Sequence, residues 1–79
     1  MDKVCKFIQN ISNGMEVLIA ISEKIPESDW IQGFVTRIID NKPFNEEGIL
    51  VQINHYNMQG NVKKILNNQT LYFRSTNTP

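Results

Sequence analysis

Short runs in which apolar side chains recur at every second position fill most of this chain, and they limit its fold more than any other feature. A period of two predicts β-strands, because successive side chains of a strand point to opposite faces. Turn-forming Gly, Pro, Asn and Asp residues separate the runs, which favours an all-β protein over alternating strands and helices. The expected strands are 15–22, 30–40, 48–54, 61–66 and 70–75.

The first residues follow a helical spacing instead. Val4, Phe7, Ile8 and Ile11 are three or four positions apart, which predicts one apolar face of a short α-helix over about residues 3–12. A helix of this length does not persist alone, so we expect it to dock on the sheet. The predicted architecture is one small domain over 1–79, with this helix, a barrel over about 15–74 and a frayed tail at 75–79.

Composition restricts the kind of site that the chain can carry. Cys5 and His55 are the only cysteine and histidine, which excludes an intrachain disulfide and argues against a zinc site, so we expect no cofactor. The sequence has no run of about 20 apolar residues and no signal-peptide pattern, which predicts no membrane contact and a cytoplasmic location. Eight basic and eight acidic residues cancel, so any binding of nucleic acid needs a local basic patch.

Three segments, taken in order, resemble a known family. They are ISNGMEVLIAISEK (11–24), IQGFVTRIIDNKPFNEEGILVQI (31–53) and GNVKKIL (60–66). Their order and spacing are similar to the YwbE-like family of small uncharacterised bacterial proteins, over about residues 11–66. The resemblance implies a small SH3-like or KOW-like barrel, a type often used for contacts with RNA, DNA or the ribosome.

The chain departs from the family pattern at three polar positions. Gln32 stands where the family tends to have arginine, residues 45–47 where it often has histidine, and Gln52 where it has a basic residue. Lys64 keeps a basic position near the end of the match. The three losses remove positive charge on which nucleic-acid binding would depend.

Candidate catalytic groups are few, and we expect no enzyme activity. A Cys–His pair would need Cys5 and His55, but Cys5 lies among apolar residues, as a packed thiol does, and His55 lies in a turn. The acidic residues of the polar loop 41–48 lack the alternating oxygen ligands of a calcium loop, so we expect them to be solvated. Pro43 and Gly48 suit a connector between two strands.

The leading hypothesis is a non-catalytic binding module that contacts RNA or another nucleic acid. Its candidate residues are Arg37, Lys63, Lys64 and Arg74, with Tyr72 as a platform for stacking bases. Regular alternation predicts that Lys63 and Lys64 point to opposite faces of their strand. It also predicts Arg37 on the same face as Ile31, Val35 and Ile39, at the rim of the barrel.

The alternative hypothesis is a protein-interaction or self-associating module, for example a phage-type inhibitor of a host factor. Trp30, Phe34 and Ile38 would form an apolar stripe along one face of the second strand. Aromatic anchors of this kind are typical of interface cores. Either the N-terminal helix covers the stripe, or the stripe binds a partner or a second copy of the chain.

Overall fold

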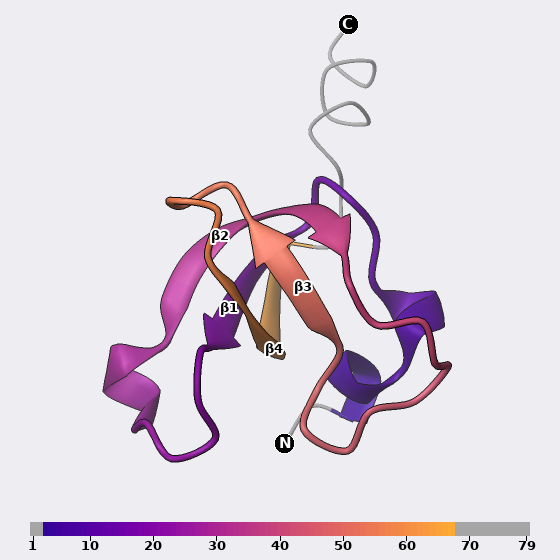
Figure 1. Ribbon diagram of the computed structural model, residues 1–79, viewed down its shortest axis with the longest axis horizontal. Helices are drawn as coiled ribbons and strands as arrows, with labels where there is room; N and C mark the ends of the chain where they lie inside the picture. The colour runs from indigo at the N-terminus through magenta and orange to yellow at the C-terminus, as the bar shows by residue number, and fades with distance from the viewer. Residues whose placement is uncertain (1–2, 68–79) are drawn as a thin grey trace, which may run out of the picture.

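The computed structural model describes residues 3–67. Four strands within this range close into an antiparallel barrel (Figure 1), in the order Glu16–Ala20 (β1), Ile31–Ile38 (β2), Leu50–Ile53 (β3) and Gln59–Asn67 (β4). The predicted small all-β barrel is confirmed, but with four strands rather than about five. The strand predicted at 70–75, with Tyr72 and Arg74, lies outside the described residues.

The interior of the barrel is filled by β-branched side chains. Val17 and Ile19 in β1, and Val51 and Ile53 in β3, are buried and two positions apart, as the period-two pattern predicts. Valine and isoleucine suit these positions because their branched side chains pack well on a pleated surface. The residues at the centre, each at most 2% exposed, are Val17, Ile19, Val35, Ile49, Val51, Ile53 and Val62.

The two long strands take part in both halves of the barrel. β2 pairs with β1 through residues 31–34 and with β3 through residues 35–38. β4 pairs with β3 through residues 59–61 and with β1 through residues 61–67. We call the outer surface of β3 and its two partners the β3 side, and the outer surface of β1 and its two partners the β1 side.

A β-bulge at Thr36 breaks the alternation of β2. Val35 pairs with Ile53 and Arg37 pairs with Gln52, so Thr36 is an extra residue without a partner of its own. The expected face for Arg37 is therefore wrong, because the extra residue turns its exposed side chain outward. The predicted stripe of Trp30, Phe34 and Ile38 is wrong for the same reason, since Ile38 packs against the core.

A second irregularity lies at Lys63 in β4. Leu18 pairs with Lys64 and Ile19 pairs with Val62, so Lys63 is the extra residue here. Val62 is buried, whereas Lys63 is half-buried and Lys64 is exposed. The prediction that the two lysines point to opposite faces is wrong, because the bulge keeps both side chains out of the core.

Gly33 lies in the middle of β2 and leaves space for a core side chain. It pairs regularly with Val17 of β1. A Cβ added at Gly33 would lie only 2.7 Å from Cδ1 of Ile53, so the missing side chain makes room for that core residue.

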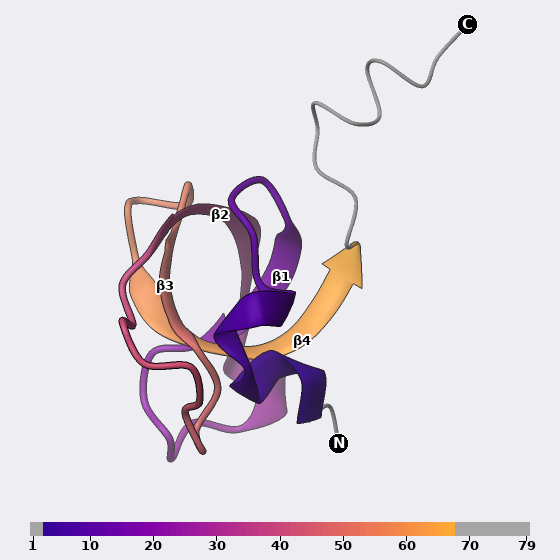
Figure 2. The same ribbon diagram turned by 90° about the vertical axis from the view of Figure 1, so that its right-hand side faces the viewer.

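The N-terminal segment, residues 3–11, is not the predicted α-helix. It consists of two short 3-10 helices, Lys3–Lys6 (η1) and Ile8–Asn10 (η2), separated by an extended Phe7 that forms a β-bridge with Phe44. Figure 2 shows η1 close to β4, and contacts join the two elements. No helix within residues 3–67 is long and apolar enough to span a membrane.

Backbone pairing with the loop 41–48 explains why the helix does not form. The N–H of Ile49 donates to the carbonyl of Cys5 (2.8 Å), and the N–H of Asn45 donates to the carbonyl of Lys6 (2.8 Å). In a continuous α-helix those carbonyls would be used within the helix itself. The exposed fractions also differ from those expected for the helix. Cys5 is 2% exposed, whereas Phe7, on the predicted apolar face, is 40% exposed.

Candidate nucleic-acid interface

A row of polar side chains crosses the β3 side of the barrel. Arg37 of β2 pairs with Gln52 of β3, and Gln52 pairs in turn with Gln59 of β4. Neighbouring strands are about 4.8 Å apart, so this polar row extends over about 10 Å. The bulge at Thr36 creates the row, because it places Arg37 on the outer surface in line with the two glutamines.

Hydrogen bonds join the polar row to the turn between β3 and β4. Nε2 of Gln59 donates to Oε1 of Gln52 (3.3 Å), and Nε2 of Gln52 lies 3.5 Å from Oδ1 of Asn57 in the turn. The hydroxyl of Thr36 donates to the carbonyl of Gln52 (3.2 Å). The amides of Gln52 and Gln59 are therefore held side by side, and Gln52, the middle residue of the row, is also joined to the turn.

The turn itself presents an aromatic ring to solvent. The N–H of Met58 donates to the carbonyl of His55 (3.0 Å), and both Tyr56 and Asn57 have a φ of 54°. These features define a type I′ turn at residues 55–58, whose two central residues have positive φ. Tyr56 is 82% exposed, and its ring meets that of His55 nearly at a right angle with 4.6 Å between centroids.

The polar row carries positive charge and no negative charge. The ion pairs within residues 3–67 are Lys6–Glu46 and Lys63–Glu47, so the guanidinium of Arg37 has no ion-pair partner in this range. Gln52 and Gln59 are uncharged, and no acidic residue lies in the turn. Such a surface suits an anionic ligand that also offers hydrogen-bonding groups.

Of the predicted nucleic-acid residues that fall within residues 3–67, the structure keeps only Arg37 on this surface. Lys64 lies on the β1 side, opposite Leu18. Nζ of Lys63 donates to the carbonyl of Glu47 (2.9 Å) and lies 3.9 Å from its carboxylate, so this lysine is used within the protein. The predicted basic set therefore does not form one patch in the described part of the chain, and Arg74 and Tyr72 lie outside it.

Sequence reasoning missed Gln52 and Gln59 as members of a site. Their pairing depends on the segment NHYNMQG, residues 54–60, which joins the two strands. Gln52 lies opposite Gln59 because the hairpin loop comprises the four residues 54–57, and the N–H of Ile53 donates to the carbonyl of Met58 (2.9 Å) across the base of this loop. The six residues between Ile53 and Gly60 contain no recognised turn motif, so the sequence marks neither the loop nor the register that the loop sets.

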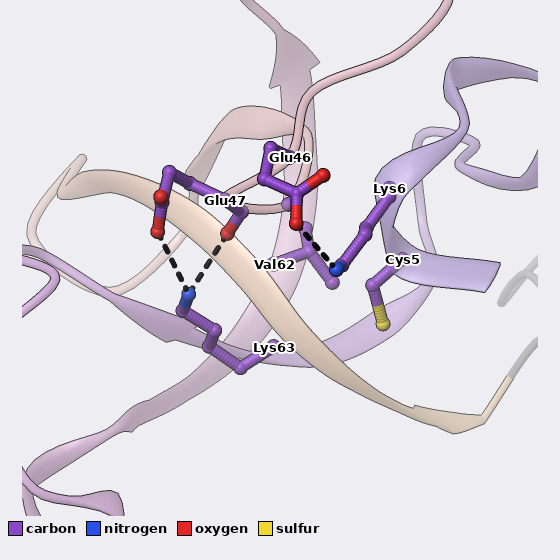
Figure 3. Close-up of a pocket in the computed structure, with 7 residues that line it drawn as sticks. Cys5, Lys6, Glu46, Glu47, Val62 and Lys63 are labelled. Atoms are coloured by element: carbon purple, nitrogen blue, oxygen red, sulfur yellow. Dashed lines mark hydrogen bonds and ion pairs between the residues drawn. The ribbon is translucent and has the colours of Figure 1, made fainter. Parts of the chain in front are cut away.

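The loop 41–48 forms one wall of a cavity of about 240 Å³. Two ion pairs cross the cavity (Figure 3): Nζ of Lys6 lies 3.3 Å from the carboxylate of Glu46, and Lys63 contacts Glu47 as described above. The side chains of Glu46 and Glu47 are 73% and 47% exposed, so these loop acids are solvated as predicted, although each also has a lysine partner. Since each lysine is matched by a carboxylate, the cavity offers little net charge to a ligand, and the loop behaves as a connector.

The candidate catalytic groups, Cys5 and His55, belong to different parts of the fold, η1 and the turn between β3 and β4. Cys5 is buried as predicted, at 2% exposure, and His55 lies in the turn as predicted. Among residues 3–67 no group of three or more His, Cys, Asp or Glu side chains could hold a metal ion.

The predicted protein interface is also rearranged. Trp30 and Phe34 are half-buried, while Ile38 belongs to the core. A different aromatic pair is exposed, since Phe7 and Phe44 contact each other with centroids 5.1 Å apart and are 40% and 43% exposed. This pair joins the N-terminal segment to the loop 41–48.

Comparisons of the chain with protein-family models, with curated proteins and with solved structures each find no match. The resemblance to the YwbE-like family therefore stays a prediction, and the function is argued from the geometry of the barrel.

Proposed function

We propose that this protein is a non-catalytic module that binds RNA or another nucleic acid through the polar row of the β3 side. The observation that carries the proposal is the position of Arg37 beside Gln52 and Gln59, with no carboxylate in the row. A guanidinium contacts phosphate through two parallel hydrogen bonds. Glutamine amides both donate and accept, so they suit the edges of bases.

The charge balance of the chain limits how this binding would work. The formal net charge is zero, so attraction over long distances is absent and contacts must be local. One arginine in the row implies few phosphate contacts and a shallow dependence on salt. For single strands, each phosphate contact lowers the logarithm of affinity by about 0.7 per tenfold rise in salt.

The test is a titration of labelled single-stranded and duplex RNA at low and moderate salt, followed by fluorescence anisotropy. We expect salt-sensitive binding that Arg37→Gln weakens. Lys64→Gln is the matched control, because Lys64 is an exposed cation on the β1 side with no ion-pair partner among residues 3–67. Absence of salt-sensitive binding, or equal losses in both variants, would contradict the proposal.

A second candidate function, binding of a protein or of a second copy of the chain, is favoured by the exposed pair Phe7 and Phe44. Aromatic side chains exposed together are typical anchors of protein interfaces. Light scattering would measure the mass of the protein in solution, and Phe44→Ser should reduce any mass above that of one chain. A strict monomer would remove self-association from consideration.

A further inference from the structure

We propose that Tyr56 is a stacking platform for an unpaired base, so that the ligand of the β3 side is a single-stranded nucleic acid. This inference rests on the proposed function and names its ligand class. It is carried by the turn between β3 and β4, where an aromatic ring is exposed to solvent and the next residue, Asn57, is joined to Gln52 of the polar row.

The backbone of the turn is the first observation. Tyr56 has a φ of 54°, in the left-handed region, where a bulky side chain is rare. Type I′ turns favour Asn or Gly at this position, and most other residues are less stable there by about 1–2 kcal/mol. Strain of this kind concentrates at sites that bind ligands. The turn would form more easily with another residue in place of Tyr56, so the stability of the turn does not account for a tyrosine at this position.

The setting of the ring is the second observation. Tyr56 is 82% exposed, and its plane lies at 83° to the plane of His55. A perpendicular contact covers at most one face of a ring, so another face of Tyr56 is open to solvent. The neighbouring Asn57 is tied to Gln52, which fixes the turn relative to the polar row. The open face is therefore presented at a defined place beside the amides.

The surroundings of the ring favour a nucleic acid over a protein. The other large exposed apolar side chains of the described chain belong to neither the turn nor β3; they are Val4, Phe7, Ile21, Phe44 and Leu66. A protein interface would need an apolar core around its anchor. Tyr56 adjoins instead the amides of Asn57, Gln52 and Gln59, and beyond them the uncompensated charge of Arg37.

The same surroundings favour a single strand over a duplex. Bases within a duplex are stacked on one another, so their faces are covered, whereas an unpaired base can stack on an aromatic side chain. Arg37 pairs with Gln52 in the polar row, and the turn that carries Tyr56 is joined to the same Gln52 through Asn57, so a phosphate and a base of one strand could be held at the same time.

The experiment measures binding of the full chain to three labelled probes of equal length: an oligouridylate of about ten nucleotides, within the usual site size, an abasic chain and a duplex. Tyr56→Gly removes the ring and relieves the backbone. Stacking contributes about 1–3 kcal/mol per base, so affinity for the oligouridylate should fall about 5-fold to 150-fold. Affinity for the abasic chain should not change, and Tyr56→Phe, which keeps the ring, should bind more tightly than Tyr56→Gly.

The outcomes separate this inference from the proposed function. If Tyr56→Gly binds the oligouridylate as the native chain does, or if the native chain binds the abasic probe equally well, stacking is overturned while the role of Arg37 stands. If the native chain binds no probe, both fail. If no probe binds and Tyr56→Gly lowers the mass of an oligomer, the turn is a protein contact, which also overturns the inference.

Discussion

Arg37 of β2 lies opposite Gln52 of β3 on the outside of the barrel. The next residue, Ile38, packs against the core. Counting in twos from buried Val35 would give the reverse arrangement, with Arg37 inside and Ile38 outside. The bulge at Thr36 therefore decides both which residue stabilises the fold and which residue is available to a ligand.

Substitutions at these two neighbours test the bulge. Ile38→Ala should lower the free energy of unfolding by about 1–3 kcal/mol, because it removes apolar contacts of a half-buried side chain. Arg37→Ala should change it by less than about 0.5 kcal/mol, as is usual for an exposed position. Urea denaturation followed by Trp30 fluorescence gives both values. The opposite ranking would mean that β2 continues without a bulge.

The strands could be predicted from the sequence because their signal is local. In β1 the half-buried Glu16 and Leu18 alternate with the buried Val17 and Ile19, so the period is visible within four residues. The bulges at Thr36 and Lys63 leave no such signal. They arise where β2 and β4 pass from one partner strand to another as the barrel closes, which depends on residues distant in sequence.

The N-terminal segment shows how a local signal can be overruled. The spacing of Val4, Phe7, Ile8 and Ile11 fits a helix, yet Phe7 pairs with Phe44 through the backbone. Helix propensity is worth only tenths of a kcal/mol per residue, so a few hydrogen bonds to the loop outweigh it. The candidate site was predictable only in part. The residues that lie beside Arg37 are set by the pairing of β2 with β3, and this pairing cannot be predicted from the residues next to Arg37 in the sequence.

Gly48 is expected to tolerate no side chain. Its φ is +101°, and an added Cβ would lie 2.1 Å from the carbonyl oxygen of Val62. Gly48→Ala should therefore lower the free energy of unfolding by about 2–4 kcal/mol, from backbone strain and the displacement of β4. Thermal unfolding followed by circular dichroism measures the loss.

Gly48→Asn separates the two causes of that loss. Asparagine tolerates positive φ better than alanine does, but it carries the same Cβ. If the contact with Val62 dominates, the asparagine variant should be about as unstable as the alanine variant. Recovery of most of the stability in Gly48→Asn would show that the backbone conformation alone matters.

Asp40 is expected to organise the loop 41–48. Its Oδ2 accepts hydrogen bonds from the N–H of Leu50 (2.8 Å) and from Nδ2 of Asn45 (2.9 Å). Asp40→Asn weakens both by removing the charge, which should lower the free energy of unfolding by about 1–2 kcal/mol. Asp29→Asn is the matched control, since Asp29 is exposed in the 3-10 helix Glu27–Asp29 (η3). Equal effects of the two substitutions in urea denaturation would contradict the prediction.

Tyr56 is expected to lower the free energy of unfolding of the barrel, although it contributes to binding of the ligand. Tyr56→Ala, Tyr56→Gly and Tyr56→Asn all remove the ring and its contact with His55, so they differ mainly in how well they accept a φ of 54°. Glycine and asparagine accept it readily, so both variants should be more stable than Tyr56→Ala by about 1 kcal/mol. Denaturation midpoints of the three proteins, compared at one temperature, measure the difference. An alanine variant as stable as the other two would mean that the turn is not left-handed at this residue.

The same variants relate stability to binding. If Tyr56→Gly and Tyr56→Asn are the more stable variants and have lost affinity for single strands, then stability and binding change in opposite directions at Tyr56. This is the result expected where backbone strain is kept for function.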